Sequence, residues 1–318
     1  MEHTTANTYL VTGGAGFIGS HVVDALVNQG HAVRVVDNFS TGYRENLARV
    51  ADKIDLHEIS ITDRDALAEA MQGVDYVFHI AALPSVPRSV ADPIGSNDNN
   101  VNGTLNVLVT ARDAGVKRVV YSGSSSAYGN ITAEYKSEDM TPQPLSPYAV
   151  AKLAAEQYCQ VFTTVYGLET VTVRYFNVFG PRQDPGSAYA AVIPKFIAAM
   201  LDDAQPTVEG DGLQTRDFTY IDNVVHGNLL ACHTPGVAGE VFNIACGGQI
   251  NLLDMIAILN RLLDKDIQPR HTDPRPGDVR HSRAAIDKAR RLLGYEPVIS
   301  FEDGLARTLA WYESTLAV

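Results

Sequence analysis

The segment TYLVTGGAGFIG, residues Thr8–Gly19, decides the fold. A short apolar strand pattern runs into Gly13, Gly16 and Gly19, and a helical pattern of apolar residues covers Phe17–Gln29. The glycines permit a tight turn, close approach of a pyrophosphate and close packing of the helix on the strand. The helix N-terminus adds unpaired N–H groups and a partial positive charge. The segment therefore predicts a site for the phosphates of a dinucleotide.

Strand and helix patterns alternate along the first half of the chain. The strand patterns cover Thr8–Thr12, Ala32–Val36, Val74–Ile80, Arg118–Ser122 and Val171–Arg174. Helical patterns lie between them, for example over Phe17–Gln29, Gly103–Ala114 and Pro147–Tyr166. Such alternation is typical of a parallel sheet covered on both faces, whose ligands bind at the carboxyl ends of the strands. We therefore expect an α/β fold with a Rossmann-like doubly wound parallel sheet.

An acidic residue follows the second strand pattern. Asp37 lies 18 residues after Gly19, where a carboxylate accepts hydrogen bonds from the ribose hydroxyls of an adenosine. The same carboxylate would repel a 2′-phosphate, so the sequence predicts NAD rather than NADP as the cofactor. A glycine turn with an unrelated surface aspartate is the alternative.

Tyr148 and Lys152 are four residues apart, behind the helix-start pair Ser146-Pro147. This spacing places both side chains on one helical face. A tyrosine base near neutral pH needs its pKa lowered by about three units, or ~4 kcal/mol. A nearby cation supplies ~1 kcal/mol in water and ~4 kcal/mol at an effective dielectric of 20, so the pair works only if it is sheltered. Alone, the spacing is also typical of a solvated helix face.

Serines follow the strand pattern that begins at Arg118. The segment SGSSSAYG covers Ser122–Gly129, and a hydroxyl at Ser124 is placed to pass a proton between a substrate and a phenolate. Serine clusters after strands also form turns. Together with the glycine loop and the Tyr148 helix, the cluster favours catalysis.

The composition excludes several classes of function. The 318 residues are 45% apolar and 19% charged, the balance of an ordinary globular protein. A net charge of -12 argues against a nucleic-acid partner. No apolar stretch reaches the roughly 20 residues of a membrane span, and the polar N-terminus lacks a secretion-signal pattern, so we expect a cytoplasmic protein with no membrane partner. Three scattered cysteines, Cys159, Cys232 and Cys246, favour buried inert thiols over a disulfide framework or a metal site.

A series of motifs in order closely resembles the extended short-chain dehydrogenase/reductase family. The motifs are Thr12–Gly19, Asp37–Ser40, His79–Ala82, Ser124–Ser126, Tyr148–Lys152, Arg174–Asn177, Gly180–Arg182, Gly210–Gly212, Thr215–Phe218 and Arg275–Asp278. They span nearly the whole chain and are most similar to the UDP-hexose 4-epimerases. Three further stretches are similar to the branch that handles UDP-N-acetylglucosamine: Ala81–Ser89, Asp184–Lys195 and Asp278–Ser282.

The resemblance implies a nucleotide-binding domain and a smaller, mostly C-terminal α/β substrate domain. The first would cover residues 1–175 with a return segment near 217–246, and the second residues 176–216 and 247–318. It also implies a homodimer formed through helices around Asn100–Ala114 and Tyr148–Tyr166, although both segments also read as ordinary core helices.

Roles carry over to matching positions only. The resemblance implies that Tyr148 is the catalytic base, that Lys152 holds the nicotinamide ribose and lowers the tyrosine pKa, and that Ser124 is the proton relay. The implied cofactor-binding residues are Gly13, Gly16, Phe17, Ile18, Asp37, Asn38, Ser40, Thr41, Gly42, Ser60, Ile61, Ala81, Ala82, Asn100, Tyr148, Lys152 and Tyr175. The implied substrate-binding residues are Ser124, Ser125, Ser126, Tyr148, Asn177, Ala191, Val192, Arg216, Arg275, Asp278 and Ser282.

Departures from the family pattern narrow the expected reaction. Ser125 and Ser126 stand where the family's dehydratases carry Asp-Glu, and Ser126 also replaces the glutamate of the UDP-glucuronate decarboxylases. Ser60 replaces the usual aspartate beside adenine, which puts the adenine contacts in doubt. Ser282 stands where similar glucose-restricted epimerases place a tyrosine, unless it caps a helix over Arg283–Leu293. These features favour 4-epimerisation of UDP-N-acetylglucosamine, and of UDP-glucose alongside it.

Three other functions stay open at this point. One is a UDP-glucuronate 4-epimerase, and another is a sugar-nucleotide dehydrogenase or reductase, which would release NADH. The third is a non-catalytic dinucleotide sensor, which has no need to keep Tyr148, Lys152 and Ser124 together.

Overall fold

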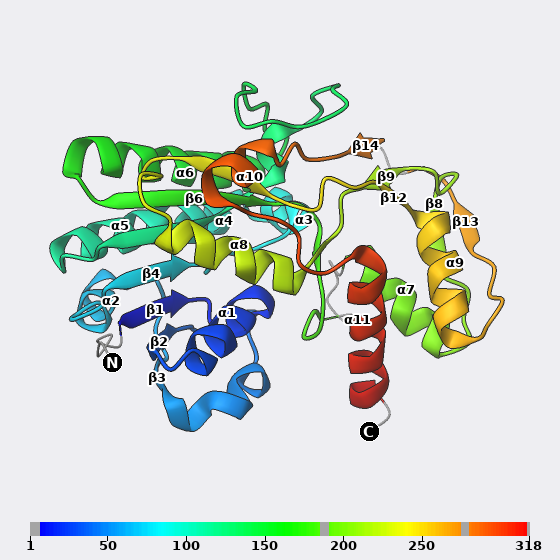
Figure 1. Ribbon diagram of the computed structural model, residues 1–318, viewed down its shortest axis with the longest axis horizontal. Helices are drawn as coiled ribbons and strands as arrows, with labels where there is room; N and C mark the ends of the chain where they lie inside the picture. The colour runs from blue at the N-terminus through cyan, green and yellow to red at the C-terminus, as the bar shows by residue number, and fades with distance from the viewer. Residues whose placement is uncertain (1–6, 185–190, 275–279, 317–318) are drawn as a thin grey trace.

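The computed structural model describes residues 7–184, 191–274 and 280–316 (Figure 1). Its centre is a seven-stranded sheet in the order β11-β6-β5-β4-β1-β2-β3, and every neighbouring pair is parallel. The strands are β1 (Thr8–Thr12), β2 (Ala32–Val36), β3 (Ile54–His57), β4 (Tyr76–His79), β5 (Arg118–Ser124), β6 (Glu169–Tyr175) and β11 (Val241–Ile244). The expected doubly wound parallel sheet is confirmed, although β3 and β11 were not predicted.

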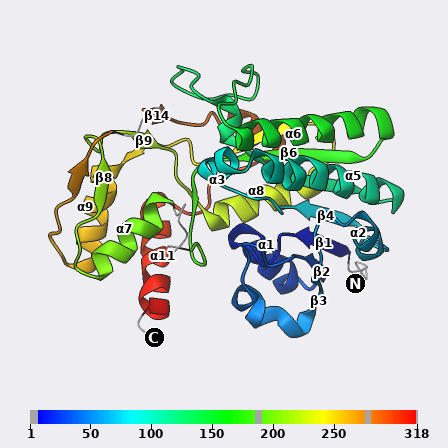
Figure 2. The same cartoon turned by 180° about the vertical axis from the view of Figure 1, so that it is seen from behind.

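Helices cover both faces because successive strand residues point to opposite sides. On one face, Tyr9 and Val11 of β1 share a buried cluster with helices α1 (Phe17–Asn28) and α8 (Ile221–His233). On the other face, Leu10 shares a cluster with the helices seen in Figure 2: α2 (Arg64–Ala70), α5 (Gly103–Asp113) and α6 (Pro147–Tyr166).

The strand order reverses between β1 and β4. Strands β2 and β3 lie on one side of β1, whereas β4, β5 and β6 lie on the other. The carboxyl ends at this reversal are where an open parallel sheet leaves a crevice for a ligand. Three short helical segments follow these ends or lead into α5: α3 (Val86–Ala91), α4 (Pro93–Asn97) and the single-turn η2 (Asp98–Asn102).

A smaller group of elements lies beside the sheet. Helices α7 (Val192–Leu201), α9 (Leu252–Leu263) and α11 (Phe301–Leu316) pack on one another, to the right in Figure 1. Short strands join them: β8 (Thr207–Glu209) with β13 (Arg270–Thr272), and β9 (Thr215–Arg216) between β12 (Ile250–Asn251) and β14 (His281–Ser282). The remaining elements are η1 (Arg44–Lys53), η3 (Ser125–Tyr128), β7 (Val178–Phe179), β10 (Thr219–Tyr220) and α10 (Asp287–Leu293).

The chain returns to the sheet after it has entered this smaller group. Helix α8 packs on β5 and β6, and β11 pairs with β6 from Val241 opposite Thr172 to Ile244 opposite Tyr175. In the described ranges, no helix is both long and apolar enough to cross a membrane.

Candidate functional site

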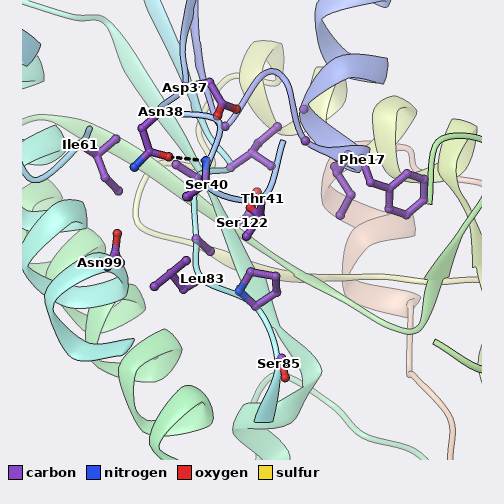
Figure 3. A pocket seen from close by; sticks show the side chains of 18 of the residues that line it. Phe17, Asp37, Asn38, Ser40, Thr41, Ile61, Leu83, Ser85, Asn99 and Ser122 are labelled. Carbon is purple, nitrogen blue, oxygen red and sulfur yellow. Dashed lines mark hydrogen bonds between the residues drawn. The ribbon is translucent and has the colours of Figure 1, made fainter. Parts of the chain in front are cut away.

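A cavity of about 650 Å³ opens at the carboxyl ends of β1, β2, β4 and β5 (Figure 3). Of the residues expected to bind the cofactor, all but Gly42 and Asn100 line it. Asp37, Asn38, Ser40 and Thr41 follow β2, and the Asn38 side chain accepts the N–H of Ser40 at 3.1 Å. The fold therefore gathers segments that are distant in sequence into one crevice.

The glycine loop leaves this crevice open to a phosphate group. Gly13 has a φ of +69°, and a Cβ there would lie 2.7 Å from the backbone of Ala81. A Cβ at Gly19 would lie 2.0 Å from the Gly13 carbonyl oxygen. No side chain larger than hydrogen fits at either point, so the backbone turns directly into α1. This cradle fits the pyrophosphate of NAD.

Asp37 fits the ribose end of the same cofactor. Its side chain is 8% exposed, and its two oxygens accept the N–H groups of Ala15 at 2.9 Å and Phe39 at 2.8 Å. Burial raises the pKa of Asp37, and the two N–H groups oppose that shift. Each carboxylate oxygen has a second lone pair, so the group retains capacity to accept ribose hydroxyls.

A buried chain of hydrogen bonds supports the floor of the cavity. The Thr12 hydroxyl oxygen accepts the N–H groups of Ile80 and Ala81, each at 3.2 Å, so its proton points to His79 Nδ1 at 2.7 Å. His79 Nε2 then donates to Thr104 at 2.9 Å. Burial and, to a smaller extent, the charge of Lys152 lower the pKa of His79 to about 3, which keeps the ring neutral.

Asn100 acts from beneath the floor and does not line the cavity. Its Oδ1 accepts the N–H of Leu83 at 2.9 Å, and its Nδ2 donates to the Leu83 carbonyl at 3.1 Å. Gly42 is also set back, since a Cβ there would lie 2.8 Å from the Ala15 carbonyl carbon. Both residues shape the cavity through a neighbour.

Tyr148 and Lys152 lie in the first turns of α6 and both line the cavity. Lys152 is 4% exposed, and its Nζ lies 4.6 Å from the centre of the Tyr121 ring. Burial lowers the pKa of Lys152 to about 8, while Cys159 and Glu156 oppose the shift. The pair is therefore sheltered, which excludes the solvated helix face that the spacing left open.

The expected lowering of the Tyr148 pKa by Lys152 is not found. Burial raises the pKa of Tyr148, and a hydrogen bond with Ser124 is what opposes the rise. Removing a phenolate from water costs free energy, and this cost outweighs the hydrogen bond with Ser124.

The serine cluster stands at the end of β5, beside Tyr148. The hydroxyls of Ser124 and Ser126 are 2.8 Å apart, and the Ser124 hydroxyl also accepts the N–H of Ser126 at 3.2 Å. Ser125 begins the η3 turn between them, and these three serines are not part of the cavity lining. Ser122, which sequence reasoning missed, does line it and lies 2.9 Å from the hydroxyl of Tyr175.

Most of the other described residues expected to hold the substrate lie outside the cavity lining: Asn177, Val192, Arg216 and Ser282. Ser282 of β14 pairs in register with Arg216 of β9, and Ala191, just before α7, lines the cavity. Asn177 has a φ of +34° and donates to the Asp217 carbonyl at 3.1 Å. Val192 is the first residue of α7; Arg275 and Asp278 lie outside the described residues.

The helix-capping alternative for Ser282 is wrong. Helix α10 begins at Asp287, and Ile286 precedes it with no side-chain cap. Ser282 lies in a strand four residues before that cap position.

Several residues of the cavity wall were not predicted from the sequence. The described lining also includes Tyr43, Ile59, Leu83, Pro84, Ser85, Arg88, Asn99, Gln183 and Asp184. Leu83, Pro84, Ser85 and Arg88 lie in the stretch Ala81–Ser89, and the backbone conformation of Ser85 marks this stretch only in the folded protein. Ser85 has a φ of +100°, a conformation that a side chain rarely adopts.

The described residues contain no group of three or more His, Cys, Asp or Glu side chains placed to hold a metal ion. Cys159 and Cys232 are buried as expected, whereas Cys246 is only partly buried.

Known proteins resemble the chain over nearly its full length. The NAD dependent epimerase/dehydratase family matches residues 9–245. A UDP-glucose 4-epimerase of Mycolicibacterium smegmatis is 38% identical and covers 96% of this chain and 98% of its own. A UDP-glucuronate 4-epimerase of Thermodesulfobacterium geofontis is 35% identical, with 97% of each chain covered.

A solved structure is similar as well. The UDP-N-acetylglucosamine 4-epimerase of Methanobrevibacter ruminantium, in complex with UDP-N-acetylmuramic acid, has a TM-score of 0.93 at 39% identity, over 98% of this chain and 99% of its own. The glycine cradle, Asp37 and these likenesses agree, and the chain belongs to the NAD dependent epimerase/dehydratase family as an enzyme that uses NAD.

Proposed function

We propose that the protein is a UDP-sugar 4-epimerase whose preferred pair is UDP-N-acetylglucosamine and UDP-N-acetylgalactosamine, with UDP-glucose and UDP-galactose also accepted. The observation that carries the proposal is the position of Tyr148, Lys152 and Ser124. A phenol, an ammonium group and a hydroxyl meet beside a cavity that fits NAD. A dinucleotide sensor has no need of this trio.

The three groups have distinct tasks. Tyr148 takes the proton of the sugar's C4 hydroxyl and later returns it to the same oxygen, and Ser124 passes that proton between sugar and phenol. Lys152 holds the nicotinamide ribose. When bound, NAD supplies the acceptor and donor of the C4 hydrogen, so the sugar is oxidised and then reduced with no net redox change. Between the two steps, the 4-keto sugar rotates so that its other face meets the cofactor.

The substrate's diphosphate must stay fixed while the sugar turns. Among the residues that the structure describes, we assign this role to Arg216, because the planar donors of a guanidinium match paired phosphate oxygens. We propose that Asn177, Ala191 and Val192 also contact the bound nucleotide sugar. Arg275 and Asp278 remain proposed as further contacts to it.

The proposed preference for an acetylated sugar rests on Ser282. It is in register with Arg216, so the nucleotide anchor and the sugar-facing residue belong to one small sheet. A serine there leaves room for a 2-acetamido group where similar glucose-restricted epimerases carry tyrosine. Similarity to a UDP-N-acetylglucosamine 4-epimerase supports the same preference.

The proposal also includes two domains in each chain and a homodimer of two chains. Helix α6 exposes an apolar row, formed by Val150, Tyr158, Val161 and Val165, and α3 and α4 expose Val90 and Ile94. Their exposure supports the homodimer that the resemblance implies, because contact with a second copy would remove these apolar side chains from water. The cytoplasmic location also stays a prediction.

The alternative is a UDP-glucuronate 4-epimerase, because such an enzyme is among the relatives. Purified protein incubated separately with UDP-glucose, UDP-N-acetylglucosamine and UDP-glucuronate distinguishes the candidates when the C4 epimers are resolved. We expect conversion of the acetylated substrate at the highest kcat/KM and no accumulation of NADH. Conversion of UDP-glucuronate alone would overturn the substrate assignment, and stoichiometric NADH would overturn epimerisation.

A further inference from the structure

Ser89 makes a hydrogen bond to the backbone of the proposed catalytic base. It lies in α3, is 1% exposed, and its hydroxyl oxygen accepts the N–H of Tyr148 at 3.0 Å. The same hydroxyl donates its proton to the Val86 carbonyl at 2.8 Å. Because that proton is engaged, a lone pair is directed at Tyr148, and the two residues are joined although they lie 59 positions apart.

The N–H of Tyr148 has no partner within its own helix. The first N–H groups of a helix lack an intrahelical acceptor, and here Pro147 precedes Tyr148 with no N–H of its own. The next N–H, of Ala149, is capped by the Ser146 hydroxyl at 3.1 Å. Val150 then bonds the Ser146 carbonyl at 2.9 Å. Two serines thus complete the first turn of α6, and Ser89 serves the residue that carries the phenol.

Ser89 also connects Tyr148 to the cavity wall. The Ser85 hydroxyl caps α3 by accepting the N–H of Arg88 at 3.2 Å, and the Ser85 carbonyl accepts the N–H of Ser89 at 3.1 Å. Leu83, Ser85 and Arg88 line the cavity, and α3 packs on α6. The loop after β4 therefore fixes both a wall of the cavity and the start of the catalytic helix.

We infer that Ser89 is a positioning residue for Tyr148: its hydroxyl sets where α6 starts and so where the phenol meets the sugar. The inference rests on the proposed function, in which Tyr148 exchanges the C4 proton. Ser89 touches neither the sugar nor the cofactor in this scheme, so its loss acts on turnover and leaves binding of both ligands unchanged.

The test compares Ser89→Ala with Ser146→Ala, which removes the other serine hydroxyl at the same helix start. For each variant, kcat, the KM for the UDP-sugar, the NAD content of the folded protein and the thermal midpoint are measured. We expect Ser89→Ala to lower kcat about tenfold or more, since small misplacement of a catalytic group is costly, with KM and NAD content within twofold of wild type. Ser146→Ala should lower the thermal midpoint about as much as Ser89→Ala does, but it should keep kcat within about threefold of wild type.

Two conservative variants and one reference complete the design. Ser89→Thr keeps the hydroxyl and should recover most of kcat, whereas Ser89→Cys keeps the size with a weaker acceptor and should lie between wild type and Ser89→Ala. The cysteine variant also decides the matter if Ser89→Ala does not fold. Equal kcat losses in Ser89→Ala and Ser146→Ala, or wild-type kcat in Ser89→Ala or Ser89→Cys, overturn the inference. Tyr148→Phe is measured beside them, and full activity in that variant would overturn the proposed function instead.

Discussion

The hydroxyl of Tyr43 donates to the carboxylate of Asp184 at 2.8 Å, and this bond joins two walls of the cofactor cavity. Tyr43 follows β2, whereas Asp184 ends the segment 181–184 that leaves β7. The same segment is tied to α1, because His21 bonds the Pro181 carbonyl at 3.0 Å and Arg182 pairs with Asp24 at 2.5 Å. These bonds hold the segment over the side of the crevice that receives the cofactor.

Tyr43→Phe should therefore release NAD faster, because it removes the donor and leaves the ring in place. An exposed contact of this kind is worth up to about 1 kcal/mol, so the dissociation rate should rise by about fivefold at most. Trapping released NAD with a coupled dehydrogenase measures that rate. Tyr135→Phe is the control, since the Tyr135 hydroxyl bonds Arg283 away from this cavity. Identical release from wild type and both variants would show that the bond does not retain NAD.

Tyr148→Phe should remove most turnover and leave NAD and UDP binding nearly intact. The phenol lines the cavity and the change deletes only its oxygen. Loss of a general acid–base group typically costs about 10²- to 10⁴-fold in rate. Steady-state kinetics with UDP-N-acetylglucosamine measure the loss, and a variant within threefold of wild type would remove Tyr148 from the mechanism.

NAD should bind more tightly than NADP, because the buried Asp37 carboxylate opposes a 2′-phosphate. Titration of both cofactors into NAD-free protein tests the order. Asp37→Asn should narrow the difference, although it also weakens the bond to one of the N–H groups of Ala15 and Phe39. Equal affinities in wild type would show that Asp37 does not select the cofactor.

Lys152→Met should stabilise the NAD-free protein while it abolishes catalysis. Burial moves the pKa of Lys152 from 10.5 to about 8, so carrying its proton costs the folded state about 3 kcal/mol at most at neutral pH. The unfolded chain keeps that proton up to about pH 10.5, so stability rises as pH increases from about 8 to 10.5. Urea unfolding at pH 7 and pH 9 should show wild type gaining about 1 kcal/mol relative to Lys152→Met. An unchanged difference between the two proteins would contradict the depressed pKa.

Ser282→Tyr should suppress the acetylated substrates selectively. The larger side chain would fill the space proposed for the 2-acetamido group, and steric exclusion discriminates more sharply than loss of one contact. The ratio of kcat/KM for UDP-N-acetylglucosamine to that for UDP-glucose measures the effect. If both substrates slow equally, or if wild type ignores acetylated sugars, Ser282 is not the gate.

Much of the nucleotide site follows from local sequence. The first strand and its glycines can be predicted from the sequence, because an apolar run must be buried and a tight turn needs residues without Cβ atoms. Strand β3 gave a weaker pattern, since Asp55 and Leu56 are exposed at the sheet edge. Strand β11 was missed because its partner β6 lies some 70 residues earlier, and no local pattern reports that pairing.

The pKa values of the site residues were harder to predict than which residues lie in the site. Tyr148 and Lys152 were placed together correctly, yet their pKa values depend on burial, which four-residue spacing does not encode. The bond from Tyr148 to Ser89 was invisible for the same reason, because it joins segments that meet only in the folded protein.

Strand β11 lies far along the chain from the other strands of its sheet, and this matters for any attempt to produce a shorter fragment. A fragment ending at Tyr175 would leave β6 as the last strand, with a row of unpaired backbone groups beside Thr172 and Val173. It would also strip the buried Arg118 guanidinium of the Ala231 and Cys232 carbonyls that accept its protons. Such a fragment should aggregate through its open edge. A fragment that keeps this sheet intact must therefore retain α8 and β11.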